Sequence, residues 1–235
     1  MSKHIFIDLE STGLEIEDRI CEMALILEED EDITSFSSLC KSSKKVKNEA
    51  MALHHITNEM LEDQVSIEKT LAYKKLQEHN LEDNVLISHN ISFDLGMLEK
   101  EGFTSYYQCI DTLRCVKALI PECEQFSLQY LRYELLLYKD EENLCEAMAC
   151  EIQAHRALSD ALHTKLLYEV LLQYATLSQL IEISSKPVLM QKLLFGKYSG
   201  RYIEEIMELD PSYLHWLLSL ENIDEDLAYS IKYYL

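Results

Sequence analysis

The order of its short apolar runs is the feature that most limits the fold of this 235-residue chain. The β-rich runs are residues 4–10, 19–28, 33–40, 84–88 and 107–110. The first three follow one another closely, whereas the last two alternate with segments of helical periodicity. A strand meander followed by strand–helix alternation is typical of an α/β fold with a sheet of mixed direction. Residues 1–180 are therefore expected to form one α/β domain.

Segments with helical periodicity separate and follow these runs. They are residues 57–61, 66–79, 93–101, 111–119, 127–138 and 156–172. Thr57 and Ser66 are the predicted N-caps of the first two, because a hydroxyl oxygen accepts a hydrogen bond from a backbone N–H of the first turn.

Composition limits both the partners and the cellular compartment. The chain has 42 acidic and 21 basic residues, and its net charge of −21 repels nucleic acid over a Debye length of about 8–10 Å. No run approaches the roughly 18–20 apolar residues of a membrane span, and Asp8 interrupts any signal-peptide core. Seven cysteines without a CxxC pair are typical of reduced thiols. A soluble cytoplasmic protein without a membrane partner is expected.

Asp8 and Glu10 lie two residues apart in the opening β-rich run. Side chains of a strand alternate between its faces, so both carboxylates point to one face while Ile7 and Leu9 point to the other. Two neighbouring acids in an apolar setting repel each other unless a cation lies between them. The pair is therefore either a cation site or a solvated pair on an edge strand.

Asp94, His155 and Asp160 are further candidates for the same site. Asp94 opens a helical segment, where an acid also interacts favourably with the helix dipole. His155 precedes Asp160 by five residues, about 500° of helical rotation, so the two side chains diverge if both are helical. They converge only if His155 lies in the loop before the helix. The alternative is a purely structural histidine.

These residue types together indicate phosphodiester hydrolysis. Four carboxylates without a cysteine ligand suit Mg²⁺ or Mn²⁺ better than Zn²⁺. Two such ions roughly 3.5–4 Å apart stabilise the attacking and leaving oxygens of a displacement at phosphorus. A histidine beside the attacking water is a suitable general base.

Three segments carry a family resemblance: FIDLESTG at 6–13, HNISFD at 89–94 and HRALSDA at 155–161. They resemble the three motifs of the DEDDh (DnaQ-like) 3′–5′ exonucleases. Shorter stretches at 53–61, 111–113 and 126–131 are similar to further family segments, except that His55 stands where glycine is usual. The resemblance covers about residues 4 to 173.

The resemblance implies an RNase H-like five-stranded mixed sheet flanked by helices. It also implies that Asp8, Glu10, Asp94 and Asp160 bind two Mg²⁺ ions, for which Mn²⁺ substitutes, and that His155 deprotonates the attacking water. Leu14 is expected to lie against the 3′-terminal base, whereas Phe93 either lines the same cleft or belongs to the core. The substrate-binding residues expected in this domain are Thr12, Gly13, Leu14, Asn90 and Phe93.

The chain is expected to end in a small, mostly helical module over residues 187–235, which binds nucleic acid or a protein. Pro187 marks its boundary, and Asp210 and Pro211 predict the N-cap and first residue of a helix that buries Trp216. The helix start at 210–216 resembles the C-terminal module of exonuclease X-like proteins.

A basic turn is the second feature that resembles this module. Residues 186–201 contain four basic residues and no acid, and FGKYSGR at 195–201 matches the family's turn. Lys197 and Arg201 are expected to contact substrate phosphates. Tyr198 stacks on a base, or else the turn is structural and Phe195 and Tyr202 fill a small core.

These features favour a metal-dependent 3′–5′ exonuclease that releases nucleoside 5′-monophosphates from DNA, preferably single-stranded DNA. The acidic surface then predicts weak binding to long duplexes, because positive charge is supplied only locally. A role in DNA repair is expected. The alternatives are an exoribonuclease similar to RNase T or oligoribonuclease, and a catalytically idle DnaQ-like scaffold. A homodimer or a polymerase partner is left open.

Overall fold

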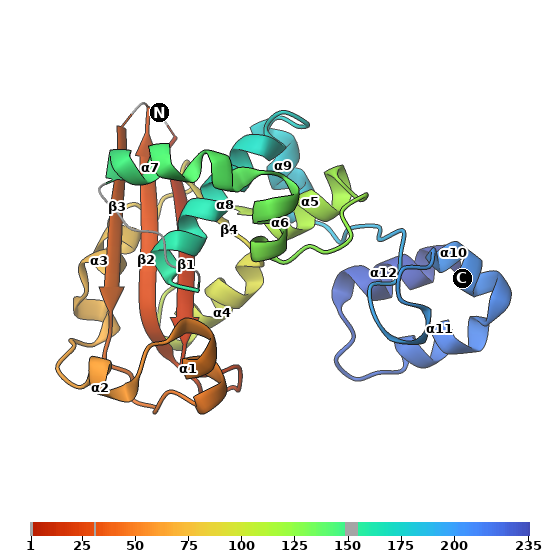
Figure 1. Cartoon of the computed structure of the whole chain (residues 1–235), viewed down its shortest axis with the longest axis horizontal. Coiled ribbons are helices and arrows are strands. Elements are labelled where there is room, and N and C mark those ends of the chain that lie inside the picture. The colour runs from red at the N-terminus through yellow and green to blue at the C-terminus, as the bar shows by residue number, and fades with distance from the viewer. Residues whose placement is uncertain (1, 31, 149–154) are drawn as a thin grey trace.

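The computed structural model describes residues 2–30, 32–148 and 155–235, and its larger unit is built on a five-stranded sheet (Figure 1). The strand order is β3–β2–β1–β4–β5, with β1 (His4–Ser11), β2 (Ile20–Glu29), β3 (Asp32–Leu39), β4 (Val85–Ser88) and β5 (Gln108–Asp111). The first three strands pair antiparallel, whereas β4 pairs parallel with β1 and β5 pairs parallel with β4. The predicted mixed sheet is confirmed, and β1 is its central strand.

Helices cover both faces of this sheet, and the helix on each face shows which side the acidic residues of β1 point to. They are α1 (Asn48–His54), α2 (Asn58–Leu61), α3 (Leu71–Glu78), α4 (Ile91–Lys100), α5 (Thr112–Leu119), α6 (Leu128–Glu134), α7 (Glu141–Met148), α8 (Ala157–Leu171) and α9 (Leu177–Ser184). Ile5, Ile7 and Leu9 of β1 belong to the core shared with α3 and α4, whereas Phe6 belongs to the core shared with α8. Because strand side chains alternate, Asp8 and Glu10 lie on the α8 side.

Helix α8 is almost fully enclosed, which fixes the second half of the site. It packs against β1 and β2 and also against α5, α6 and α7, and twelve of its residues are buried. A helix that is apolar on most sides is expected in such a place. The predicted helix at 156–172 is confirmed to within one residue at each end.

The single helix predicted at 66–79 is wrong, because the chain divides there at Thr70. One short turn covers Ile67–Lys69, and α3 begins only at Leu71. Thr70 is the N-cap of α3 through its hydroxyl, which accepts a hydrogen bond from the backbone N–H of Tyr73 at 3.2 Å. The nearer threonine therefore takes the capping role predicted for Ser66.

Other helix boundaries also differ from the prediction. The helix predicted at 127–138 ends at Glu134, because Leu136 adopts a left-handed conformation with φ of 59°. Helices α1, α7 and α9 were not predicted from the sequence. Since α9 packs against β5 and α5, the α/β unit extends to Ser184, and a boundary at residue 180 falls inside this helix.

The C-terminal residues form a small helical unit that Figure 1 shows beside the α/β unit. It consists of α10 (Ile203–Leu209), α11 (Pro211–Leu218) and α12 (Glu225–Tyr234). Asp210 caps α11 and Pro211 is its first residue, as predicted. Trp216 is 52% exposed, so its predicted burial is wrong. The buried core residues are Leu193, Ile203, Ile206, Leu214, Leu217, Leu227 and Ile231.

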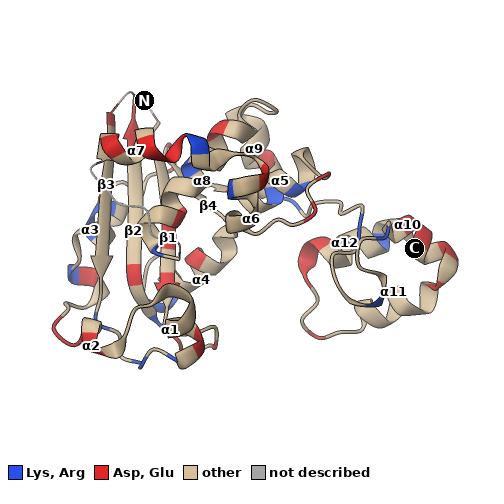
Figure 2. Cartoon of the chain, in the orientation of Figure 1, with Lys and Arg blue, Asp and Glu red and all other residues tan. Residues whose placement is uncertain are grey.

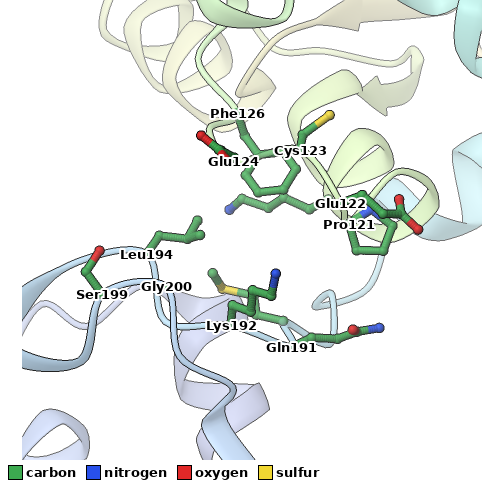
Figure 3. A pocket seen from close by; sticks show the side chains of 12 residues that line it. Pro121, Glu122, Cys123, Glu124, Phe126, Gln191, Lys192, Leu194, Ser199 and Gly200 are labelled. Atoms are coloured by element: carbon green, nitrogen blue, oxygen red, sulfur yellow. The ribbon is translucent and has the colours of Figure 1, made fainter. Parts of the chain in front are cut away.

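The two units meet where α5 faces α12. Asp226 of α12 is buried, and its carboxylate oxygens lie 3.6 Å from Arg114 Nε and 3.6 Å from Lys117 Nζ of α5. Figure 3 shows a pocket of about 340 Å³ beside this contact, lined by residues of the loop before α6 and of the segment 190–200. The charged contact thus joins the units beside a pocket that both polar and apolar residues line.

Two further findings concern the predicted compartment. No helix in the described part of the chain is long and apolar enough to cross a membrane. Cys21 and Cys40 are buried free thiols, and burial raises the pKa of Cys40 to about 12. Cys150 lies outside the described residues.

Candidate active site

Three carboxylates meet between the end of β1 and the first turn of α8. One oxygen from each of Asp8, Glu10 and Asp160 lies within 4.8 Å of the others. The strand alternation brings Asp8 and Glu10 to the face covered by α8, and the early position of Asp160 in that helix brings it to the same end. The structure therefore brings together three of the four predicted metal ligands at one point.

Asp94 lies beside this cluster but is not part of it. It is 3% exposed in the first turn of α4 and accepts a hydrogen bond from Ser88 Oγ at 2.5 Å. Its negative charge nevertheless acts on both Asp8 and Glu10. Asp94 thus contributes to the same electrostatic site from a more recessed position.

The site strongly disfavours its own negative charge. Burial, followed by repulsion from Asp160, raises the pKa of Asp8 well above its usual range and that of Glu10 to about 8. Burial also raises the pKa of Asp94 to about 7, although the hydrogen bond from Ser88 opposes this. A bound divalent cation would stabilise the charged form of these crowded carboxylates, because hard cations prefer oxygen ligands.

In the absence of metal, we expect the free energy of unfolding to fall as the pH rises from about 5 to 8. The raised pKa values of Glu10 (about 8) and Asp94 (about 7) mean that the folded state retains protons which the unfolded state has already released. Stability falls with pH wherever the folded state binds more protons. Thermal unfolding in a chelator measures this trend. Mg²⁺ should raise Tm more at pH 8 than at pH 5.5, and equal increases would contradict the assignment.

His155 lies in the turn immediately before α8, as convergence with Asp160 requires. Its φ is 55°, a left-handed conformation, and Arg156 is the N-cap residue that follows. Glu22 of β2 fixes this turn: one of its carboxylate oxygens lies 3.0 Å from Arg156 Nε and accepts the backbone N–H of Ala157 at 3.1 Å. Sequence reasoning missed Glu22, although it is the one acid within the apolar run from Ile20 to Leu27.

Two residues that were not predicted hold Asp160 in place. Gln129 of α6 donates a hydrogen bond from Nε2 to Asp160 Oδ1 at 2.6 Å, and His163 Nδ1 lies 3.5 Å from the same oxygen. The other ring nitrogen of His163 lies 3.1 Å from Glu141 Oε1, and Arg132 Nη2 donates to Glu141 Oε2 at 2.7 Å. The spacing of His163 three residues after Asp160 on one helix was the available signal.

A groove with a volume of about 700 Å³ opens beside Glu10. Leu14, which is 86% exposed, and Gly13 line the groove near Glu10, and Phe93 lines it from α4. Phe93 also packs against the core cluster of α3 and α4, so both of the roles considered for it apply. The remaining lining residues are Leu9, Ser11, Glu15, Lys47, Glu49, Ala50, Leu53 and His54.

Thr12 and Asn90 are not among the residues that line this groove. Thr12 is fully buried, and its hydroxyl donates to Asp18 Oδ1 at 2.9 Å and accepts from Arg19 N at 3.1 Å. Asn90 is the residue before α4, where its side-chain oxygen accepts a hydrogen bond from Ser92 Oγ at 3.1 Å. Both side chains thus hold local turns, and their predicted contact with substrate stays a prediction.

The basic turn of the C-terminal unit is largely engaged within that unit. Lys197 Nζ lies 3.0 Å from Asp210 Oδ2, and the Tyr198 hydroxyl donates to the same oxygen at 2.9 Å. Tyr198 also packs edge-on against Tyr213, with ring centroids 5.2 Å apart, and the stacking on a base that the sequence suggested stays a prediction. Phe195 is 49% exposed and does not fill the small core. Arg201 is exposed and has no carboxylate partner in the described part of the chain.

Comparison with known proteins agrees with this geometry. The exonuclease family model matches residues 5–168, and the exodeoxyribonuclease X-like C-terminal model matches residues 193–223. Exodeoxyribonuclease 10 of Escherichia coli K12 is 30% identical over 234 residues, which cover 97% of each chain. The 3′–5′ exonuclease DinG of Bacillus subtilis is 31% identical over 77% of this chain and 19% of its own length.

Solved structures show the same fold. Exonuclease X in complex with 5′ overhanging duplex DNA aligns with a TM-score of 0.59 and 24% identity, over 78% of this chain and 99% of that one. Exonuclease I of E. coli in complex with a dA16 oligonucleotide aligns with a TM-score of 0.55 and 19% identity, over 77% of this chain and 42% of that one. The sheet and its acidic cluster define an RNase H-like nuclease. The chain belongs to the DnaQ-like 3′–5′ exonuclease family, as its three motifs predicted.

Proposed function

We propose that this protein is a 3′–5′ exonuclease of DNA in which Asp8, Glu10, Asp94 and Asp160 hold two Mg²⁺ ions. The observation that carries the proposal is the meeting of Asp8, Glu10 and Asp160 oxygens within 4.8 Å. Their raised pKa values and all-oxygen chemistry fit hard divalent cations, so Mn²⁺ would also serve. When bound, such ions stabilise the charge that develops on the reacting phosphate.

In this proposal His155 is the general base. The residues between His155 and Asp160 form less than two helical turns, and the Glu22–Arg156 contact holds the histidine's turn against β2. His155 accepts a proton from the attacking water, and the water oxygen forms a bond to phosphorus. The bond from phosphorus to the 3′ oxygen of the preceding nucleotide then breaks, and this oxygen takes up a proton from water to become the new 3′ hydroxyl, so a nucleoside 5′-monophosphate leaves.

We infer that the substrate is DNA with an unpaired 3′ end. Exodeoxyribonuclease 10 is a deoxyribonuclease by name, and the similar structures of exonucleases X and I contain DNA. The exposed Leu14 and the half-buried Phe93 line a groove beside Glu10 that suits the flat face of an unpaired base. Gly13 sits in the same wall, where an added Cβ would lie 2.5 Å from Asp18 Oδ2.

The test is release of mononucleotides from labelled oligomers. Single-stranded DNA, RNA of the same sequence and a DNA duplex are each compared with Mg²⁺ and with a chelator. We expect stepwise shortening from the 3′ end, fastest on single-stranded DNA and absent in chelator. Faster release from RNA would instead support the exoribonuclease alternative, and no release from any substrate would support an idle scaffold.

The buried thiols Cys21 and Cys40 suit a reducing compartment, so we propose that the enzyme acts in the cytoplasm. We also propose a role in DNA repair, which the similarity to exodeoxyribonuclease 10 and to a DNA-bound exonuclease X supports. Of the two cations expected to contact phosphate in the C-terminal unit, Arg201 remains the better candidate because Lys197 is paired with Asp210.

A further inference from the structure

We propose that residues 41–47, called here the lysine loop, bind the phosphate backbone of the nucleic acid whose 3′ end occupies the groove. The loop contains Lys41, Lys44, Lys45 and Lys47 and no acid, in a chain with a net charge of −21. The inference rests on the proposed exonuclease function and names the surface that holds the substrate beyond its terminal nucleotide.

The lysine loop connects β3 to α1 and adjoins the groove directly. Lys47 lines the groove, and its backbone N–H donates to Thr12 O at 3.0 Å, in the turn that also carries Gly13 and Leu14. Figure 2 shows α1 and α2 at the end of the sheet where β1 ends, which is the end that holds Glu10. The loop and the acidic cluster therefore lie at the same end of the molecule.

The loop is fixed to the body of the protein at its second half. Val46 is 3% exposed and belongs to a small core with Cys21, Ile56 and Leu61. Its backbone N–H donates to Asn58 Oδ1 at 2.8 Å, and Asn58 Nδ2 donates to Val46 O at 3.3 Å. Because these contacts already order the loop, substrate binding does not have to supply that ordering.

Two of the four lysines are available for phosphate. Lys47 Nζ is held by Asp18 at 2.8 Å and by Glu15 at 2.9 Å, and Lys41 Nζ donates to a backbone carbonyl at 3.1 Å. Lys44 and Lys45 are exposed and form no ion pair with any carboxylate of the described residues. An acidic protein repels a polyanion except where unpaired cations face it, so these two are suited to attract it.

The reach of the loop limits which phosphates it contacts. Lys44 is three residues from Lys47, and three extended residues span at most about 11 Å. At the spacing of about 3.4 Å per nucleotide in a duplex strand, which is the shortest that applies, this distance corresponds to at most about three nucleotides. Lys44 and Lys45 are therefore assigned to phosphates a few nucleotides from the 3′ end.

The experiment compares K44Q/K45Q with K69Q/K74Q in the full chain. Lys69 and Lys74 are also exposed, and removal of their charges changes the net charge equally. They lie on the turn before α3 and on α3, which cover the face of the sheet opposite to α8. Binding of a fluorescent single-stranded DNA is measured in chelator from 50 to 200 mM salt. Affinity falls as salt rises. Because each phosphate contact adds about 0.7 to the steepness of log affinity against log salt, two lost contacts should make the line less steep by about 1.4. Wild-type affinity should therefore fall about sevenfold further than that of K44Q/K45Q across this range.

Two additional substrates identify the phosphates and give the outcomes that decide the proposal. If the lysine loop holds the degraded strand, the salt dependence of K44Q/K45Q differs from that of the wild type with single-stranded DNA. If the loop holds a complementary strand, the two proteins differ only with a 3′-overhanging duplex. A dinucleotide should bind both variants alike, because it is too short to reach Lys44. An unchanged slope on both longer substrates, or the same change in K69Q/K74Q, would overturn the proposal. Normal binding without nucleotide release by the wild type would contradict only the exonuclease function.

Discussion

Replacing Asp8 with asparagine should abolish the exonuclease while it makes the metal-free protein more stable. Asparagine keeps the shape of the side chain but removes one of the three charges that crowd at the end of β1. Loss of about 4 kcal/mol of metal-ion stabilisation at the reacting phosphate corresponds to a rate lower by about a thousandfold. Mononucleotide release from single-stranded DNA in Mg²⁺ measures this effect.

The stability half of the Asp8→Asn prediction separates a metal ligand from a residue that merely supports the fold. Burial and repulsion raise the pKa of Asp8, so a neutral side chain should raise Tm in chelator and reduce the increase in Tm that Mg²⁺ causes. The control is Asp63→Asn, which changes the net charge equally at an exposed position. Activity that survives in Asp8→Asn, or a lower Tm in chelator, would count against the metal assignment.

The sequence predicted the part of the site that depends on local geometry. The alternation of Ile7, Asp8 and Glu10 determines which side chains face α8, because strand periodicity does not depend on distant residues. The five-residue spacing of His155 and Asp160 likewise required a loop before the helix, and α8 begins two residues after His155. The order of the apolar runs likewise predicted an α/β sheet of mixed direction, whereas its RNase H-like topology was an implication of the family resemblance.

Contacts between distant segments were not predictable in this way. Glu22 and Ala157 lie 135 residues apart, and nothing local shows that the acid in β2 faces the start of α8. Gln129 contacts Asp160 because α6 packs against α8, which is a property of the completed fold. Trp216 fits the apolar pattern of α11, but in this three-helix unit the fully buried positions of the helix are Leu214 and Leu217, and Tyr213 and Leu218 pack partly against the core.

Replacing His155 with asparagine should lower the rate of nucleotide release by about 10²-fold or more. Asparagine is preferred to alanine here because φ of His155 is 55°, a conformation that asparagine adopts with little strain. The substitution therefore removes the imidazole and leaves the turn before α8 and its contacts with Glu22 intact. Metal binding should be retained, because the four carboxylates are unchanged. Single-turnover hydrolysis and the increase in Tm caused by Mg²⁺ measure the two effects independently.

His55 provides the matched control, since it is exposed, is also left-handed with φ of 62°, and lies directly after α1. His55→Asn makes the same chemical change in the same backbone conformation, so any general cost of the substitution appears in both variants. A loss of rate confined to His155→Asn, with an unchanged response of Tm to Mg²⁺, is the result that a general base requires. An equal loss in both variants, or a rate in His155→Asn close to that of the wild type, would mean that another group accepts the proton of the attacking water.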